Sequence, residues 1–215
     1  KVLDWTVPDE WTIRDAYIMN ESGHKIVDFK NHNLHVMGYS EPVDKWLRLE
    51  DLEQHLYSRP EQPDAIPYVT SYYERRWGFC LTHNQRSKLK QGNYRVVIDS
   101  EHKPGVLNYG ELILRGESRQ EVFLSTYICH PSMANDNLSG VVVATALYKL
   151  IRDLPDRYYS YRFIWVPETV GAIAWLAKNK NPVRDRTVAG MVFSCTGDDG
   201  PLTWKSSRQG NAEVD

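Results

Sequence analysis

Residues 128–140 read Ile-Cys-His-Pro-Ser-Met-Ala-Asn-Asp-Asn-Leu-Ser-Gly, and the rest of the chain is organised around this stretch. The run before it, Glu121 to Cys129, is apolar and predicts a buried strand. The run after it, Gly140 to Leu154, repeats apolar residues at helical spacing and predicts a helix that Pro155 ends. The stretch itself is a short polar loop with one histidine and one aspartate. In an open α/β sheet, loops of this kind at the carboxyl ends of strands carry ligand-binding groups.

Strands and helices alternate on both sides of this unit. The order strand, helix, strand, helix, strand favours a largely parallel or mixed sheet with helices on both faces, so we assign residues 92–215 to an α/β core. The further runs predict strands at 94–98, 106–114, 161–166 and 187–195, and a short helix at 170–178.

Residues 1–91 have a different texture. Many turn signals interrupt short apolar runs, which is typical of a β-rich domain with short strands. One short helix is expected from about Leu49 to Tyr57, before Pro60. We therefore predict two domains, a β-rich domain over 1–91 and the α/β core over 92–215.

Composition narrows the class of protein. The 215 residues are 41% hydrophobic and 25% charged, as in a soluble globular protein with a real core. The net charge is −2 and no cluster of Lys and Arg stands out, which argues against a nucleic-acid partner. No apolar run approaches the roughly 18–20 residues that cross a membrane. Three cysteines without a CxxC pair suggest free thiols in a reducing compartment, so we expect a cytoplasmic protein.

Three predicted strands end on residues that can do chemistry. His130 and Asp136 follow the first strand, Glu168 follows the second, and Asp198 with Asp199 follows the third. Because the carboxyl ends of parallel strands meet at one edge, these side chains could converge on one point. An imidazole and carboxylates around an open position are what a catalytic zinc site requires.

Each of these residues also has a structural interpretation. A single histidine at a strand end is more often hydrogen-bonded than metal-bound. Asp136 could cap the helix that follows it, and Glu168 could interact with a helix dipole. Asp198 and Asp199 form an ordinary turn sequence. Only their shared position at successive strand ends favours a metal site.

Three segments carry a resemblance to a known family. Residues 127–140, residues 166–171 (Val-Pro-Glu-Thr-Val-Gly) and residues 77–80 (Trp-Gly-Phe-Cys) resemble the co-catalytic zinc aminopeptidases of peptidase clan MH. They are similar in particular to a bacterial aminopeptidase-like subfamily associated with polysaccharide biosynthesis. The resemblance implies a three-layer zinc-aminopeptidase-like fold, with the β-rich part as an inserted or lid domain.

The resemblance also implies roles for residues. His130 would hold a metal ion, Asp136 would bridge or hold metal, and Asp198 would be the distal carboxylate ligand. Asp199 is the fallback for that last position, and Glu168 falls where the family places its general base. One or two zinc ions are the implied cofactor. The peptide bond at Asp136 is expected to be cis, as it often is at the bridging aspartate of this superfamily.

The sequence departs from the family pattern in three ways. Thr169 replaces the second glutamate of the usual pair, which is a metal ligand. The usual His-x-Asp becomes His130-Pro131-Ser132, so the carboxylate that would orient the histidine is missing. The last ligand of the family, a histidine late in the fold, has no counterpart, and we expect a chain truncated at both ends with an incomplete core.

The favoured function is that of a zinc metallopeptidase or aminopeptidase that cleaves a peptide or another amide bond with activated water. The alternative is a catalytically impaired aminopeptidase-like fold that acts as a binding or interaction module. Thiol catalysis is a weaker third option. Cys129 and His130 are neighbours along a strand and should point to opposite faces, whereas Cys80 and His83 lie in a turn-prone segment without an evident orienting carboxylate. The expected partner is a peptide or a small amide substrate, without nucleic acid or membrane, and a homo-oligomer is allowed.

Overall fold

The computed structural model describes residues 1–212 and 214–215. The chain divides into two compact units, one formed by Pro8–Val106 and one by Lys1–Val7 together with Leu107–Asp215. Among the described residues, no helix has the length and apolar character that a membrane span needs. Each unit is described by itself.

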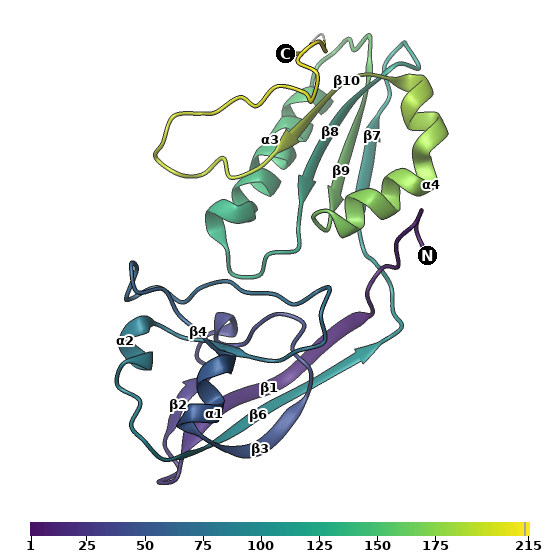
Figure 1. Ribbon diagram of the computed structural model, residues 1–215. Coiled ribbons are helices and arrows are strands. Elements are labelled where there is room, and N and C mark those ends of the chain that lie inside the picture. The colour runs from purple at the N-terminus through teal and green to yellow at the C-terminus, as the bar shows by residue number, and fades with distance from the viewer. Residues whose placement is uncertain (213) are drawn as a thin grey trace. The chain divides into compact units, whose positions relative to one another are not determined.

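The unit Pro8–Val106 is built on an antiparallel sheet (Figure 1). Its strands lie in the order β2-β1-β6-β3, and β6 pairs with both β1 and β3. The strands are β1 (Glu10–Asn20), β2 (Lys25–Asp28), β3 (Val43–Arg48) and β6 (Asn93–Lys103), with a second, parallel pair of β4 (Leu56–Tyr57) and β5 (Phe79–Cys80) and the short helices α1 (Leu49–Leu52) and α2 (His83–Arg86).

Side chains along β1 and β6 point alternately to the two faces of the sheet, and those on one face form the core of this unit. Ala16 lies opposite Ile98, and Ile18 lies opposite Val96, so all four side chains share one face. These four side chains are at most 1% exposed. Phe79 packs into the same cluster. The helix expected from Leu49 to Tyr57 is shorter than predicted, because its last two residues form β4.

The strand β6 lies in a different unit from the one that the sequence predicted. We expected a boundary at residue 91, whereas the β-rich unit continues to Val106. The cause is strand pairing: β6 is hydrogen-bonded on both sides to strands of this unit. An apolar run reveals a strand but not its neighbours in the sheet.

The second unit contains a mixed sheet in the order β10-β8-β9-β7 (Figure 1). The strands β10, β8 and β9 are parallel to one another, and the edge strand β7 runs antiparallel to β9. The expectation of a largely parallel or mixed α/β sheet is therefore confirmed. The elements are β7 (Gly110–Leu114), β8 (Glu121–Tyr127), α3 (Gly140–Arg152), β9 (Ser160–Val166), α4 (Val170–Arg186) and β10 (Thr187–Phe193). The kinked segment Ala134–Ser139 leads into α3 and is not helical at Asp136 and Asn137.

The two long helices cover opposite faces of this sheet (Figure 1). Phe163 of β9 contacts Tyr148 of α3, with 5.7 Å between the ring centres. Its neighbour Ile164 packs with Trp175 of α4. Successive residues of a strand point to opposite faces, so α3 and α4 lie on different sides.

Several predicted boundaries differ from the structure, among them the start of β7 at Gly110 and the ends of β6, β8, α4 and β10. The helix α4 extends to Arg186 and contains Pro182, whereas the sequence predicted an end near Lys178. Residues 178–181 are Lys-Asn-Lys-Asn and have no apolar stripe, so periodicity could not reveal that the helix continues. The strand β8 ends at Tyr127, two residues before the predicted end.

The amino-terminal edge of the sheet holds a buried ion network. Arg162 of β9 donates from Nε to Glu121 Oε2 at 2.6 Å and from an Nη atom to Glu121 Oε1 at 2.9 Å. Glu111 of β7 also pairs with Arg162, and Arg186 at the end of α4 lies 3.7 Å from Glu121. The opposite, carboxyl edge of the strands is where the candidate site lies.

Candidate metal centre

Three adjacent parallel strands deliver their following loops to one edge of the sheet. The order β10-β8-β9 places the loop after β8 between the other two. His130 and Asp136 lie in the central loop, Glu168 follows β9, and Asp198 follows β10. The arrangement agrees with the general location of ligand sites in open α/β sheets.

The structure brings His130 and Glu168 together. Nε2 of His130 lies 3.4 Å from Oε2 of Glu168. The imidazole is 10% exposed, whereas the carboxylate is 50% exposed. The buried ring thus faces a carboxylate that remains open to water.

Cys129 joins this pair and was not predicted to do so. Its Sγ lies 3.3 Å from Nδ1 of His130, and the backbone N–H of Glu168 donates to the same sulfur at 3.0 Å. The expectation that Cys129 and His130 point apart is wrong, because β8 ends at Tyr127 and strand alternation does not extend to these residues. One ligand atom from each of the three residues lies within 4.8 Å of the other two.

The thiol of Cys129 is a poor nucleophile in this setting. Burial raises its pKa above the ordinary value, and the Glu168 carboxylate acts in the same direction, although the Glu168 N–H opposes them. Reactive catalytic cysteines instead have lowered pKa values that favour the thiolate. The raised pKa therefore argues against thiol catalysis by Cys129.

Asp136 is held by a tyrosine at the end of β8. The hydroxyl of Tyr127 donates to Asp136 Oδ1 at 2.5 Å and lies 2.9 Å from Ser194 Oγ. Burial raises the pKa of Tyr127, and the hydrogen bond to Asp136 raises it further, so the hydroxyl remains a donor. The peptide bond between Asp136 and Asn137 is cis, as the resemblance implied. Asp136 is not one of the three residues grouped around His130.

Hydrogen bonds of the Asn137 side chain hold the loop after β8 in place. Its side chain is buried, and its Nδ2 donates to Thr126 Oγ1 at 2.8 Å and to the carbonyl of Tyr127 at 3.1 Å. Its Oδ1 accepts the backbone N–H of Cys195 at 3.0 Å. The residue therefore connects the loops after β8 and β10. The sequence offered no signal for this role beyond a polar residue in a loop.

Asn135 and Ser139 complete the connection between these two loops. Asn135 donates to Asp198 Oδ2 at 3.0 Å and accepts the backbone N–H of Gly197 at 2.8 Å. Ser139 Oγ accepts the backbone N–H of Thr196 at 3.0 Å. Asp198 therefore faces the loop after β8, and both Asp198 and Asp199 are exposed. Asp198, like Asp136, lies outside the group around His130.

Each of the three loops contains one strained backbone position. Ser132, Thr169 and Cys195 have φ angles of 60°, 52° and 50°, a region that side chains other than glycine rarely adopt. Thr169 directly follows Glu168. Such positions cluster at functional sites, where the surrounding structure holds them in place.

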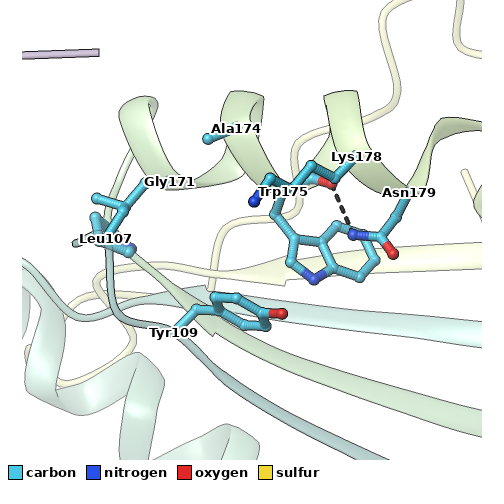
Figure 2. Close-up of a pocket in the computed structure, with 8 residues that line it drawn as sticks. Leu107, Tyr109, Gly171, Ala174, Trp175, Lys178 and Asn179 are labelled. Carbon is cyan, nitrogen blue, oxygen red and sulfur yellow. Dashed lines mark hydrogen bonds between the residues drawn. The ribbon is translucent and has the colours of Figure 1, made fainter. Parts of the chain in front are cut away.

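A small cavity lies on the α4 face of the sheet, next to this edge (Figure 2). Pro167, Gly171 and Trp175 line it, and Figure 2 shows the ring of Tyr109 facing the indole. The indole Nε1 of Trp175 is buried without a hydrogen-bond partner among the described residues. The cavity has a volume of about 70 Å³, well below the roughly 300–1,000 Å³ of a typical ligand pocket, so it cannot hold a whole substrate.

The donor set around His130 fits a zinc ion. A thiol sulfur, an imidazole nitrogen and a carboxylate oxygen are the three ligand types that zinc accepts in proteins. One ligand atom of each residue lies within 4.8 Å of the other two. The thiol faces Nδ1 of His130 at 3.3 Å, and the carboxylate faces Nε2 at 3.4 Å, so an ion would bind through one of these two nitrogens. The residues present are therefore compatible with the cofactor that the sequence implied.

Comparisons with known proteins place the whole chain in one family. Residues 1–215 match the family described as "Domain of unknown function (DUF4910)". A protein of Clostridium acetobutylicum named "Putative polysaccharide biosynthesis protein with aminopeptidase-like domain" is 49% identical over 100% of this chain and 49% of its own length. A crystal structure of a "putative peptidase" from that species has a TM-score of 0.95 and 49% identity, covering 100% of this chain and 50% of its own. The chain spans about half the length of these two relatives.

Two more distant structures share the fold. A peptidase M28 precursor from Shewanella amazonensis has a TM-score of 0.57 and 12% identity, covering 85% of this chain and 58% of its own. A zinc aminopeptidase from Bacillus subtilis has a TM-score of 0.53 and 11% identity, covering 86% of this chain and 56% of its own. At these identities the likeness establishes a similar mixed α/β fold and no activity.

Proposed function

The chain belongs to the DUF4910 family, and we propose that it carries the core of a metal-dependent amide hydrolase of the aminopeptidase type. The observation that supports this most is the approach of His130 to Glu168, at 3.4 Å, on the carboxyl edge of the sheet. The aminopeptidase-like name of one relative and the fold shared with a zinc aminopeptidase point the same way. We also propose that the α/β core has three layers and that the β-rich domain is inserted into it.

The proposed ligands come from the loops after β8 and β10. His130 would hold zinc, with Asp136 and Asp198 as carboxylate ligands. Tyr127 would orient Asp136, and Asn135 would orient Asp198, through the hydrogen bonds that they donate. One or two ions are proposed, although Thr169 offers no carboxylate for a second.

Glu168 is the proposed general base. When bound, zinc supplies Lewis acidity that brings the pKa of a water molecule towards neutrality. The half-exposed carboxylate of Glu168 would accept the proton of that water and return it to the leaving amine. Its backbone N–H, bound to Cys129 Sγ, fixes where the side chain begins.

The proposed substrate is a peptide or another amide-containing small molecule. The names of the relatives support a peptide, and one of them adds an association with polysaccharide biosynthesis. A cytoplasmic location is proposed because Cys80, Cys129 and Cys195 are all free thiols. Neither nucleic acid nor membrane is a proposed partner, and a homo-oligomer is allowed.

Thr169 supports the alternative of a binding or interaction module. A hydroxyl at the position of a family metal ligand weakens the site, and a fold that had lost its chemistry would keep the loop geometry without turnover. The two functions differ in whether a zinc-loaded protein hydrolyses any amide.

The test is hydrolysis of a panel of aminoacyl and N-acyl chromogenic amides by the zinc-loaded chain. Glu168→Gln should lower kcat by roughly 10²–10⁴-fold, because a general base contributes about that much. Glu117→Gln, an exposed glutamate in the turn between β7 and β8, is the matched control and should have no effect. Bound zinc without hydrolysis of any substrate would contradict the hydrolase and favour the binding module.

A further inference from the structure

We propose that Cys129 is a sulfur ligand of the metal ion held by His130. This inference rests on the proposed function for the presence of a metal ion. The inference goes beyond the proposed function because it assigns a sulfur ligand, whereas the predicted ligands are one histidine and carboxylates. The site would then combine sulfur, nitrogen and oxygen donors.

Geometry is the first support. Sγ of Cys129 is 3.3 Å from Nδ1 of His130, and one ligand atom each of Cys129, His130 and Glu168 lies within 4.8 Å of the others. Among the described residues these three form the one group of histidine, cysteine and carboxylate side chains with such spacing. Neither Asp136 nor Asp198 belongs to this group.

The surroundings of the sulfur are the second support. The backbone N–H of Glu168 donates to Sγ at 3.0 Å. Hydrogen bonds from backbone amides to ligand sulfurs are one of the ways in which proteins tune metal–thiolate centres. The donor comes from the loop after β9, so it also fixes the sulfur relative to the carboxylate of Glu168.

The other two cysteines lie outside this group of three residues. Cys80 is buried in the β-rich unit. Cys195 is exposed, and its Sγ lies 3.7 Å from the hydroxyl of Tyr127 rather than beside an imidazole. Cys195 is therefore a matched control in the same unit, next to the site but outside the donor group.

Binding would convert the thiol into a thiolate without any redox change. The S–H bond breaks, its proton leaves to water, and a sulfur lone pair forms the bond to the ion. A thiolate ligand favours zinc or cobalt over magnesium, calcium and manganese, which prefer oxygen. The site should therefore select the softer ions more strongly than an all-carboxylate site would.

Cobalt(II) in place of zinc gives a direct test, since a cobalt–thiolate bond adds a charge-transfer absorption in the near ultraviolet. The wild-type chain and Cys195→Ser should both show this absorption at one ion per chain. Cys129→Ser should lose it and bind cobalt at least about tenfold more weakly, because even partners beyond the ligand shell cost that much. Circular dichroism of each variant checks that the fold is retained.

Alkylation gives a second measurement that does not depend on cobalt spectra. Iodoacetamide should modify Cys129 more slowly in the zinc-loaded chain than in the metal-free chain, while modification of Cys195 stays unchanged. Cobalt binding at full affinity in Cys129→Ser, with no sulfur absorption in the wild type, would overturn the proposal and leave the metal site of His130 standing. Absence of any cobalt or zinc binding would overturn the proposed function as well.

Discussion

Tyr127 connects the sheet to the candidate metal centre through one hydroxyl. It lies at the last position of β8, and its hydroxyl reaches both Asp136 and Ser194. The hydrogen bond from Tyr127 therefore fixes Asp136 relative to the end of the sheet. Asn137 has a comparable role for the backbone, since it binds the N–H of Cys195 in the loop after β10.

Tyr127→Phe is expected to weaken zinc binding without unfolding the chain. The substitution removes the hydroxyl that orients Asp136 and keeps the ring that contacts His130. Loss of such an orienting partner typically costs about 10–100-fold in metal affinity. Competition with a zinc-chelating dye measures the change, and Tyr109→Phe in the nearby cavity is the control. Equal zinc affinity in the wild type and Tyr127→Phe would contradict the role of Tyr127 in orienting Asp136 as a ligand.

Residue types alone indicated part of this site. The positions of His130 and Glu168 after neighbouring strands predicted that they share an edge, and the structure places them 3.4 Å apart. The contact of Cys129 with His130 was not predictable, because it depends on where β8 ends. The roles of Asp136 and Asp198 as ligands stay predictions.

At the scale of elements, the start of α3 lies very close to the end of β10. Gly140 is the first residue of α3, and a Cβ there would lie 2.6 Å from the carbonyl oxygen of Phe193 and 2.5 Å from Asn137 Oδ1. Only glycine lets the helix begin against the strand at this distance. The helix thereby brings the loop with Asp136 to the edge of the sheet.

Gly140→Ala is therefore expected to destabilise the chain, although alanine is the better helix former by about 1 kcal/mol. Steric overlap in a packed site costs about 1–3 kcal/mol, which exceeds that gain. Gly190→Ala is the control, because its Cβ would meet the nearest atom at an ordinary 3.4 Å. Urea denaturation measures both. A Gly140→Ala chain as stable as the wild type would contradict the close approach.

The apolar patterns predicted where the strands and helices lie in the sequence better than which strands pair with one another. The runs that became β8, α3, β9 and β10 were located within about two residues at most ends, since buried elements carry a clear pattern. The length of α4 was missed because its second half is polar. Membership of β6 in the other sheet depends on pairing with β1 and β3, which no local pattern encodes.

At the scale of the whole molecule, pH should act on stability through Glu121. Burial alone would raise the pKa of this carboxyl, but hydrogen bonds and charges from Arg162, with the charge of Arg186, outweigh burial and hold it below the ordinary 4.5. A carboxyl whose pKa is lowered in the folded state stabilises that state at pH values above 4.5, its ordinary pKa. This contribution is lost as pH falls through the lower, folded pKa.

Glu121→Gln isolates this contribution. At neutral pH the variant should be less stable by about 1.5–3 kcal/mol, because Arg162 loses its charged hydrogen-bond acceptor Glu121 and keeps only Glu111 as a carboxylate partner. The difference from the wild type should shrink as pH falls below 4.5, where the wild-type carboxyl also becomes neutral. Denaturation at a series of pH values measures it, with the exposed Glu117→Gln as control. A difference that stays constant down the series would contradict the ion pair.

The central claim is that His130 anchors a metal ion at the carboxyl edge of the α/β sheet. Its most direct test is an anomalous difference map, recorded at the zinc absorption edge from crystals of this chain grown with one equivalent of zinc. The account predicts one strong peak within bonding distance of a ring nitrogen of His130, beside Glu168, and its loss in His130→Ala. A map without a peak at His130, or with its strongest peak at another histidine, would contradict the account.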